Sequence, residues 1–170
     1  MATRQAVPVS GSAELIALLT ERKLRIAVAE SLTGGLLIAE LINTPGASAV
    51  VLGGVVAYNT ELKRSVLGVD AAVLNVHGAV HPDVAIQMAV RVREVLAVDG
   101  LPAEIGVATT GVAGPESQDG FPPGTAYLAI AVGSDVRVKK LSVSGDRNTI
   151  RAAVVAEAIA ELSQRVHDSR

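Results

Sequence analysis

The stretch Ile26-Ala-Val-Ala-Glu-Ser-Leu-Thr-Gly-Gly-Leu-Leu-Ile-Ala-Glu40 constrains the fold of this chain more than any other. Residues 26–29 are apolar and partly β-branched, which is typical of a buried strand. Residues 36–42 are good helix formers with no helix breaker among them, so they predict a helix. Residues 30–35 must therefore form a strand-to-helix turn that carries hydroxyl groups just before a pair of glycines.

Two interpretations of this turn follow from the residues alone. The free N–H groups at a helix start bind anions or a developing oxyanion, and glycines there let the backbone approach a ligand closely. Ser31 would then stand where nucleophilic serines stand in hydrolases that have a nucleophile elbow. Alternatively, Ser31 or Thr33 is an ordinary N-cap, because both residue types are favoured at that position.

The rest of the chain alternates between strand-like and helix-like segments. Helices are predicted from residue 12, over 60–67, from residue 82 and over 146–166, and strands over 25–29, 50–58, 104–110, 125–132 and 136–143. This order predicts an α/β fold with three layers: helices on both faces of a mixed, largely parallel sheet of about five to six strands. Gly53 and Gly54 predict a bulge or a close approach. The apolar pattern of the last strand changes phase, which predicts a bulge at Lys139 and Lys140.

Length and composition narrow the class of protein. The 170 residues have an even composition, which predicts one domain over residues 1–170, with residues 1–11 as a loose lead-in. Hydrophobic residues make up 49% and aromatic residues 2%, so the core must be aliphatic. The net charge of −2 disfavours a general nucleic-acid binder, which usually carries a basic excess.

Other functions are disfavoured by missing residue types and segments. With no cysteine, the chain forms no disulfide and has no thiolate nucleophile or Cys-ligated metal. His77, His81 and His167 fit no metal-binding spacing, so no metal site is predicted. No signal segment and no apolar run of membrane-spanning length is visible, so we expect a cytoplasmic protein without a membrane partner.

Three further stretches are candidates for chemistry. Tyr58 and Lys63 flank a strand-to-helix junction, where both can point at one spot and where a desolvated lysine can act as a base. The alternative is a packing tyrosine and a solvated lysine. Thr110 and Gly111 close a buried strand and could line a pocket, or form an ordinary turn. Arg147 opens the last helix and would suit a phosphate, or is a solvated charge beside an N-cap.

These motifs together resemble one known family. In chain order they are Ala29-Glu-Ser-Leu-Thr-Gly-Gly35, Val56-Ala-Tyr-Asn-Thr-Glu-Leu-Lys63, Leu67-Gly-Val69, Gly78-Ala-Val80, Thr110-Gly-Val-Ala-Gly-Pro115, Pro123-Gly-Thr125 and Gly145-Asp-Arg147. The pattern is similar to the CinA carboxy-terminal domain family, the nicotinamide-nucleotide amidohydrolases, over nearly the whole chain. The length resembles the stand-alone form of the family. Residues 116–120 depart from it, because many members have a run of glycines there.

The resemblance implies hydrolysis of the carboxamide of nicotinamide mononucleotide to the nicotinate nucleotide and ammonia. It implies Ser31 as the nucleophile, with Tyr58 and Lys63 as its activating pair, and Lys63 taking the serine proton directly or through Tyr58. Backbone N–H groups of residues 33–35 would hold the oxyanion. The substrate-binding residues it implies are Glu30, Thr33, Gly34, Gly35, Asn59, Thr110, Gly111 and Arg147.

The same resemblance implies no metal or redox cofactor, a small-molecule nucleotide as substrate and a homo-oligomeric protein. Two alternatives from another class stay open. One is a catalytically silent nucleotide-binding or regulatory domain, and the other is an interaction module whose apolar surface serves a partner. The trio of Ser31, Tyr58 and Lys63 favours the enzyme, because a binding domain has no need of it.

Overall fold

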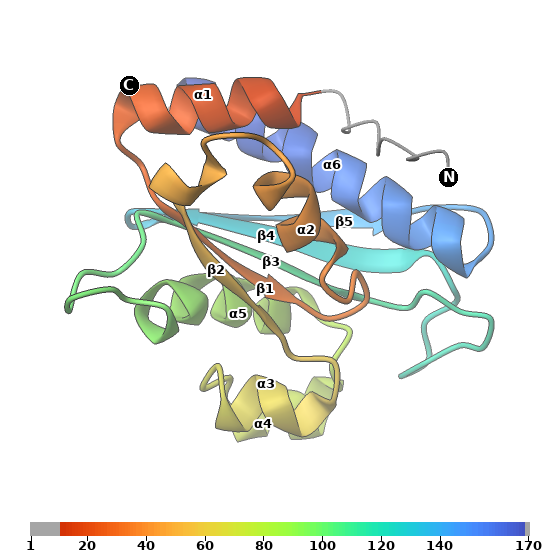
Figure 1. Ribbon diagram of the computed structural model, residues 1–170. Coiled ribbons are helices and arrows are strands. Elements are labelled where there is room, and N and C mark those ends of the chain that lie inside the picture. Colours follow the sequence, from red (N-terminus) through yellow and green to blue (C-terminus); the bar gives the residue numbers. More distant parts are fainter. Residues whose placement is uncertain (1–10, 169–170) are drawn as a thin grey trace, which may run out of the picture.

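The computed structural model describes residues 11–168, which form one mixed sheet between two layers of helices (Figure 1). The strands are β1 (Ile26–Glu30), β2 (Val51–Val56), β3 (Ile105–Gly111), β4 (Thr125–Val132) and β5 (Asp135–Ser142). Their order in the sheet is β2-β1-β3-β4-β5. Strand β1 runs parallel to β2 and β3, whereas β3–β4 and β4–β5 are antiparallel pairs. The predicted three-layer α/β fold with a mixed sheet is confirmed, with five strands.

The helices divide between the two faces of the sheet. They are α1 (Ser12–Arg22), α2 (Leu36–Ile42), the short 3-10 turn η1 (Ala47–Ala49), α3 (Thr60–Ser65), α4 (Ala71–His77), α5 (Pro82–Val95) and α6 (Arg147–Asp168). Helices α1, α2 and α6 cover one face, and α5 covers the other with α3 and α4 beyond it (Figure 1). Each face buries its own aliphatic cluster against the sheet, as the scarcity of aromatic residues predicts.

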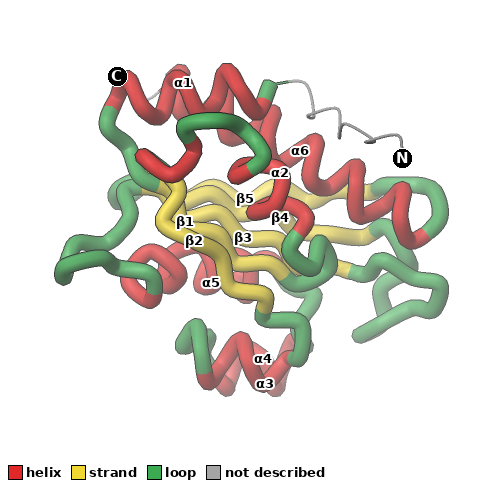
Figure 2. Tube along the Cα trace, in the orientation of Figure 1, coloured by secondary structure: helices red, strands yellow, loops and turns green. Residues whose placement is uncertain are grey.

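The connections place a crevice at one end of the sheet. The chain leaves β1, passes through α2 on one face and returns as β2; it then passes through α3, α4 and α5 on the other face and returns as β3 (Figure 2). Strand β1 therefore lies between two parallel neighbours, β2 and β3. The connection from β1 to β2 and the connection from β2 to β3 run on opposite faces of the sheet. In open α/β sheets, ligands bind beyond the carboxyl ends of the strands at such a point. Residues that directly follow β1, β2 and β3 meet there.

The structure bears out the irregularity predicted at Gly53 and Gly54 in β2. The pairing of β1 with β2 shifts by one residue between Ile26 and Ala27, and a Cβ on Gly54 would lie 3.1 Å from Ile38. The bulge and the close approach predicted at Gly53 and Gly54 are therefore both present.

The predicted bulge at Lys139 and Lys140 is wrong, because β4 and β5 pair in continuous register. Strand β5 is partly covered on both faces: Leu141 is buried in the cluster under α6, while Val136 packs on the α5 side. The apolar residues therefore change phase without any change in the backbone.

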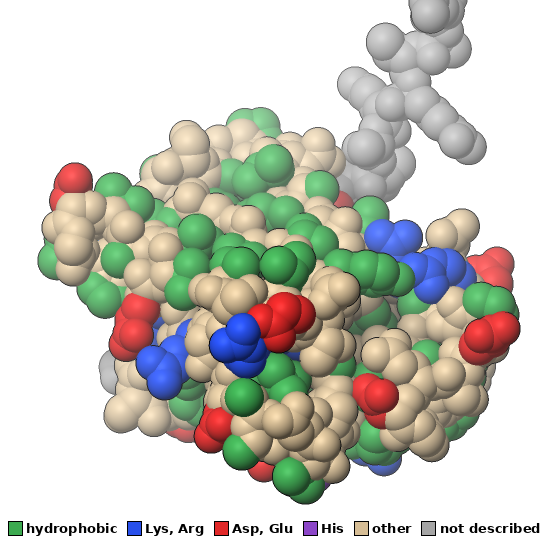
Figure 3. Space-filling view, turned by 90° about the horizontal axis from the view of Figure 1, so that it is seen from below, with side chains coloured by type: hydrophobic (Ala, Val, Ile, Leu, Met, Phe, Trp, Pro, Cys, Tyr) green, Lys and Arg blue, Asp and Glu red, His purple; other side chains and the backbone are tan. Residues whose placement is uncertain are grey.

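Helix α4 was not among the predicted elements. It begins at Asp70, whose carboxylate accepts a hydrogen bond from the N–H of Ala72. The lead-in predicted over residues 1–11 lies, except for Gly11, outside the described residues. Seen from the side of α3 and α4, Lys and Arg side chains are scattered among Asp and Glu, so the described residues form no extended basic patch on that face (Figure 3). None of the described helices is both long and apolar enough to cross a bilayer.

Candidate active site

Ser31 lies directly after β1, at the carboxyl end of the sheet. Its N–H donates to the carbonyl of Thr109 at 2.9 Å, which continues the ladder between β1 and β3 by one residue. The hydroxyl groups of Thr33 and Thr109 are hydrogen-bonded at 2.7 Å. Ser31 is 7% exposed. The turn is thus held by backbone and side-chain contacts to β3, and the serine is nearly buried at the end of the strand.

The start of helix α2 is capped by Glu30. This carboxylate is fully buried and accepts hydrogen bonds from the N–H groups of Gly35 at 3.0 Å, Leu37 at 3.0 Å and Ile38 at 2.8 Å. A carboxylate at a helix N-terminus satisfies groups that otherwise have no partner and complements the helix dipole. The interpretation of Ser31 as the N-cap is therefore wrong, and its hydroxyl is available for another role.

Lys63 reaches Ser31 from behind the turn. It lies on α3, which begins at Asn59, where the side-chain oxygen accepts from the N–H of Glu61 at 2.8 Å. The Lys63 side chain is 1% exposed, and its Nζ lies 2.9 Å from Ser31 Oγ and 2.7 Å from the carbonyl oxygen of Ala57. The carbonyl directs one N–H bond, so a neutral Nζ can turn its lone pair toward the serine hydroxyl.

Burial changes the charge state of Lys63. Loss of water around the amine lowers its pKa to about 8, and the negative charge of Asp119 opposes this shift. A base works best when its pKa lies near the operating pH. Lys63 therefore has the position and the basicity that a general base for Ser31 needs.

A cleft of about 450 Å³ opens over Ser31. Its walls are formed by residues at or after the ends of β1, β2 and β3, by the segment after α4 and by the start of α6: Ser31, Leu32, Tyr58, Ala79, Val80, Thr110, Gly111, Val112, Ala113, Gly114, Pro115, Glu116, Ser117, Gln118 and Arg147. Tyr58 is 57% exposed, and its hydroxyl accepts a hydrogen bond from Arg147 at 2.9 Å. Arg147 also donates to the carbonyl of Gly114 at 2.7 Å. These contacts hold the guanidinium at the mouth of the cleft.

The structure brings most of the predicted catalytic and cleft residues together. Ser31, Tyr58, Thr110, Gly111 and Arg147 line one cleft, with Lys63 directly behind Ser31. Tyr58 is bonded to Arg147, and no hydrogen bond among the described residues joins it to Lys63 or Ser31. The contact that would activate the serine is thus the direct one from Lys63, without a relay through Tyr58.

Five residues predicted to bind substrate do not line this cleft: Glu30, Thr33, Gly34, Gly35 and Asn59. Glu30 and Asn59 cap helices, and Thr33 ties the turn to β3. The N–H of Gly34 donates to the carbonyl of Ser31, and that of Gly35 donates to Glu30. These two N–H groups are therefore not free to hold an oxyanion, and that part of the expectation is wrong.

Backbone groups around the turn were only partly identified from sequence patterns, which pointed to the N–H groups of residues 33–35 and not to that of Leu32 or to the carbonyls. Within residues 11–168, the N–H groups of Leu32 and Thr33 have no hydrogen-bond partner. The carbonyls of Leu32 and Thr33 accept from Arg151 on α6, which ties the turn to a second element. The carbonyl of Ala57 directs Lys63. Contacts to the backbone leave no residue-type signal, so only the fold could reveal them.

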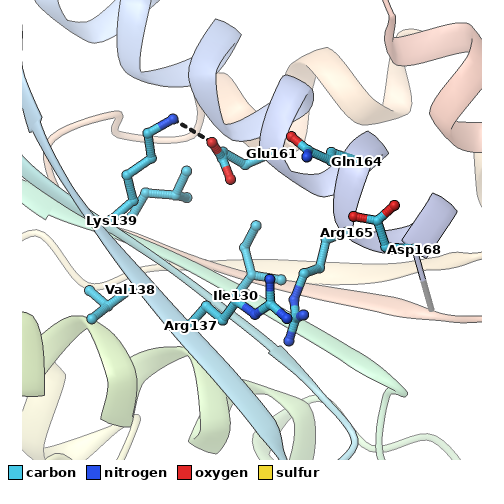
Figure 4. Close-up of a pocket in the computed structure, with 9 residues that line it drawn as sticks. Ile130, Arg137, Val138, Lys139, Glu161, Gln164, Arg165 and Asp168 are labelled. Atoms are coloured by element: carbon cyan, nitrogen blue, oxygen red, sulfur yellow. Dashed lines mark hydrogen bonds and ion pairs between the residues drawn. The ribbon is translucent and has the colours of Figure 1, made fainter.

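A second cavity, of about 270 Å³, lies between β5 and the end of α6 (Figure 4). Its three basic groups are already paired, Lys139 with Glu161 and both Arg137 and Arg165 with Asp135. Its lining contains no hydroxyl nucleophile among the described residues. In the same part of the chain, no three His, Asp or Glu side chains are grouped to hold a metal ion. The cleft over Ser31 is therefore the better candidate for an active site.

Comparison with known proteins agrees with this fold. Residues 10–166 match the CinA C-terminal domain. A CinA-like protein of Frankia casuarinae is 43% identical over 145 residues, which cover 85% of this chain and 32% of that protein, so the chain spans about a third of the curated relatives it matches. Crystal structures of a CinA superfamily protein from Klebsiella pneumoniae 700603 and of competence damage-inducible protein A from Klebsiella pneumoniae MGH 78578 are also similar.

The first of these structures has a TM-score of 0.88 and 31% identity, covering 95% of this chain and 99% of its own. The second has a TM-score of 0.85 and 36% identity, covering 95% of this chain and 100% of its own. The sequence match and both superpositions extend across the sheet, the helices and the cleft described above. The chain therefore belongs to the CinA C-terminal domain family.

Proposed function

We propose that this protein is a serine amidohydrolase that removes the carboxamide nitrogen of nicotinamide mononucleotide as ammonia. The observation that carries the proposal is the buried Lys63 amine, 2.9 Å from Ser31 Oγ at the floor of a cleft. Burying a lysine amine costs stability, so such a residue is a candidate for a function, and a lysine within hydrogen-bond distance of a serine can activate that serine. The nucleotide is suggested by the family resemblance, and a cleft of about 450 Å³ is of a size that holds small ligands.

In the first half of the reaction, Ser31 Oγ attacks the carboxamide carbon while neutral Lys63 takes the hydroxyl proton. The new oxyanion would be held by the free N–H group of Leu32, which lines the cleft, in place of those of Gly34 and Gly35. When the tetrahedral intermediate collapses, the C–N bond breaks and Lys63 returns its proton to the nitrogen. Ammonia leaves, and the acyl group remains on Ser31 as an ester.

In the second half, water enters the position that ammonia has left. Lys63 takes a proton from this water as its oxygen attacks the ester carbon. The C–O bond to Ser31 breaks, the serine oxygen receives the proton from Lys63, and the nicotinate nucleotide is released. The balance is one amide and one water consumed, with one carboxylic acid and one ammonia formed, which requires no redox partner.

The test of this proposal is the reaction itself. Purified protein is incubated with nicotinamide mononucleotide, and ammonia and nicotinate nucleotide are both quantified. The proposal expects the two products in equal amounts and at a rate proportional to protein concentration. A protein that binds the nucleotide by calorimetry but releases neither product would instead be the silent binding domain, and the proposed activity would be wrong.

Arg147 at the mouth of the cleft is expected to contact the phosphate of the nucleotide. Its guanidinium is exposed and held toward the cleft by Gly114 and Tyr58. Arg147→Ala should lower kcat/KM for the mononucleotide by on the order of 10- to 100-fold, the loss of one charge-assisted contact. Steady-state kinetics measure this change.

Nicotinamide riboside, which lacks the phosphate, is the matched control substrate for this variant. If Arg147 binds the phosphate, Arg147→Ala should change kcat/KM for the riboside much less than for the mononucleotide. Equal losses on both substrates would mean that Arg147 keeps the shape of the cleft, through its hydrogen bonds to Tyr58 and Gly114, and does not bind the phosphate. Unchanged rates on both would leave it a surface charge.

A further inference from the structure

The loop of residues 112–124, between β3 and β4, lines the cleft with residues 112–118 and carries at its tip a side chain that the reaction scheme does not use. Near its tip, Gln118 and Phe121 exchange two backbone hydrogen bonds, of 3.1 and 2.8 Å. Asp119 and Gly120 form the two-residue turn between them, both with positive φ, of 51° and 79°. An Asp-Gly pair with this backbone makes a tight turn that matches strand twist. The turn gives the loop tip a defined shape and aims Asp119 outward from it.

Asp119 reaches from this tip to the opposite wall. Its Oδ2 accepts a hydrogen bond from the N–H of Ala79 at 3.0 Å. The carbonyl of Ala79 in turn accepts from Thr110 Oγ1, at the end of β3, at 2.7 Å. Ala79 and Val80 line the cleft opposite the loop. The segment after α4 is thus fastened on both sides, by Thr110 from the sheet and by Asp119 from the loop.

Gly78 leaves room for the carboxylate of Asp119 next to Ala79. It has φ 73°, and a Cβ built on it would lie 2.6 Å from both Cγ and Oδ2 of Asp119. A carbon at that distance would push the carboxylate away from Ala79. Glycine is therefore required here for two reasons: the left-handed backbone and the approach of the carboxylate.

We propose that Asp119 is a positioning residue of the cleft: its carboxylate ties the 112–124 loop to the Gly78–Ala79 turn and so fixes two facing walls around Ser31. The contact is made by the Asp-Gly turn at the tip of the loop and by the backbone of Gly78 and Ala79. Its effect on turnover rests on the proposed function, whereas its effect on the two walls does not.

The charge of Asp119 has a second consequence. The negative charge of Asp119 raises the pKa of Lys63, whereas burial of the amine lowers it. The other titratable groups around these elements are Glu30 behind the turn, Tyr58, Glu116 and Arg147 around the cleft, and His77 and His81 beside Gly78. Removing the Asp119 charge should therefore let the pKa of Lys63 fall, and neutral Lys63 should persist to lower pH.

Three variants separate the hydrogen bond from the charge. Asp119→Asn keeps an oxygen that accepts from Ala79 but has no charge, whereas Asp119→Ala loses both. Gly78→Ala keeps the charge and displaces the carboxylate. Gly100→Ala is its control, because Gly100 has a similar φ of 76° with nothing within 4 Å of the added carbon. Any strain from the left-handed backbone is then present without the clash.

The measurements are amide exchange at Ala79 by NMR and titration of the Lys63 side-chain signal in the intact protein. Asp119→Ala and Gly78→Ala should speed the exchange at Ala79 by about fivefold or more, as expected for one lost hydrogen bond. Asp119→Asn and Gly100→Ala should leave it near the parental rate. The titration midpoint of Lys63 should move to lower pH in both Asp119 variants.

Parental exchange at Ala79 in Asp119→Ala would overturn the proposal, and so would an unmoved Lys63 midpoint in Asp119→Asn. In an active enzyme, Asp119→Ala should also raise KM about fivefold. Asp119→Asn should instead shift the acid limb of kcat/KM to lower pH with KM near the parental value. If the parent protein releases no ammonia, the proposed function fails, and the exchange and titration still decide the role of Asp119.

Discussion

Ser31→Ala should lower ammonia release from nicotinamide mononucleotide by several orders of magnitude while leaving nucleotide binding near the parental level. The variant removes only the oxygen that would form the covalent bond, and loss of a nucleophile has effects of this size in comparable schemes. The N–H of residue 31 still bonds to Thr109, and the cleft walls do not depend on the hydroxyl. Calorimetry with the mononucleotide and an ammonia assay measure the two quantities.

The melting temperature of Ser31→Ala separates loss of chemistry from loss of fold. Because Glu30 caps α2, removal of the hydroxyl should not release the start of that helix. The variant should therefore melt near the parental temperature. Ser134→Ala, in the turn between β4 and β5, is a matched control that should keep full activity. Turnover of Ser31→Ala within tenfold of the parent would contradict the assignment of Ser31 as nucleophile.

Lys63→Met should also abolish nearly all turnover, because it removes the only base within hydrogen-bond distance of Ser31 among the described residues. Methionine is unbranched and similar in length, so it can fill the same buried space. Lys140→Met replaces an exposed lysine and should be silent. A folded Lys63→Met protein that turns over at the parental rate would exclude Lys63 as the base.

The pH dependence follows from the same group. Below a pKa of about 8, Lys63 is mostly protonated and cannot accept the serine proton. The logarithm of kcat/KM should therefore rise with pH on the acid side and level off near pH 8.

The same lysine should make the stability of the protein depend on pH. In the unfolded chain the pKa of Lys63 returns to its ordinary, higher value, so at a pH between the folded and the unfolded pKa the unfolded state binds more protons. This lysine should therefore make the folded state more stable as pH rises through that window, and Lys63→Met should lack this gain.

The sequence predicted the fold where residue patterns repeat. Strand β1 has an unbroken apolar pattern and α5 a regular amphipathic one, and both were located to within a residue or two. Helix α4 was missed because only seven residues and one capping aspartate define it. The false bulge at Lys139 and Lys140 arose because β5 is partly covered on both faces, so its apolar pattern follows two clusters.

The candidate site was predictable only in its side chains. A serine, a lysine, a tyrosine and an arginine stood in recognisable motifs, and the crossing connections bring those motifs to one end of the sheet. The contact that each side chain makes was not predictable. That Glu30 caps α2, that Tyr58 pairs with Arg147 and that Lys63 is directed by a carbonyl all depend on tertiary packing.

The central claim is that the substrate becomes covalently attached to Ser31 during turnover. The most direct measurement is mass spectrometry of the peptide containing Ser31, after the reaction with nicotinamide mononucleotide is quenched in acid during the first turnovers. We expect this peptide to carry the acyl group of the nicotinate nucleotide in the parent protein and to be unmodified in Ser31→Ala. Steady release of ammonia with the Ser31 peptide unmodified at every quench time would contradict it.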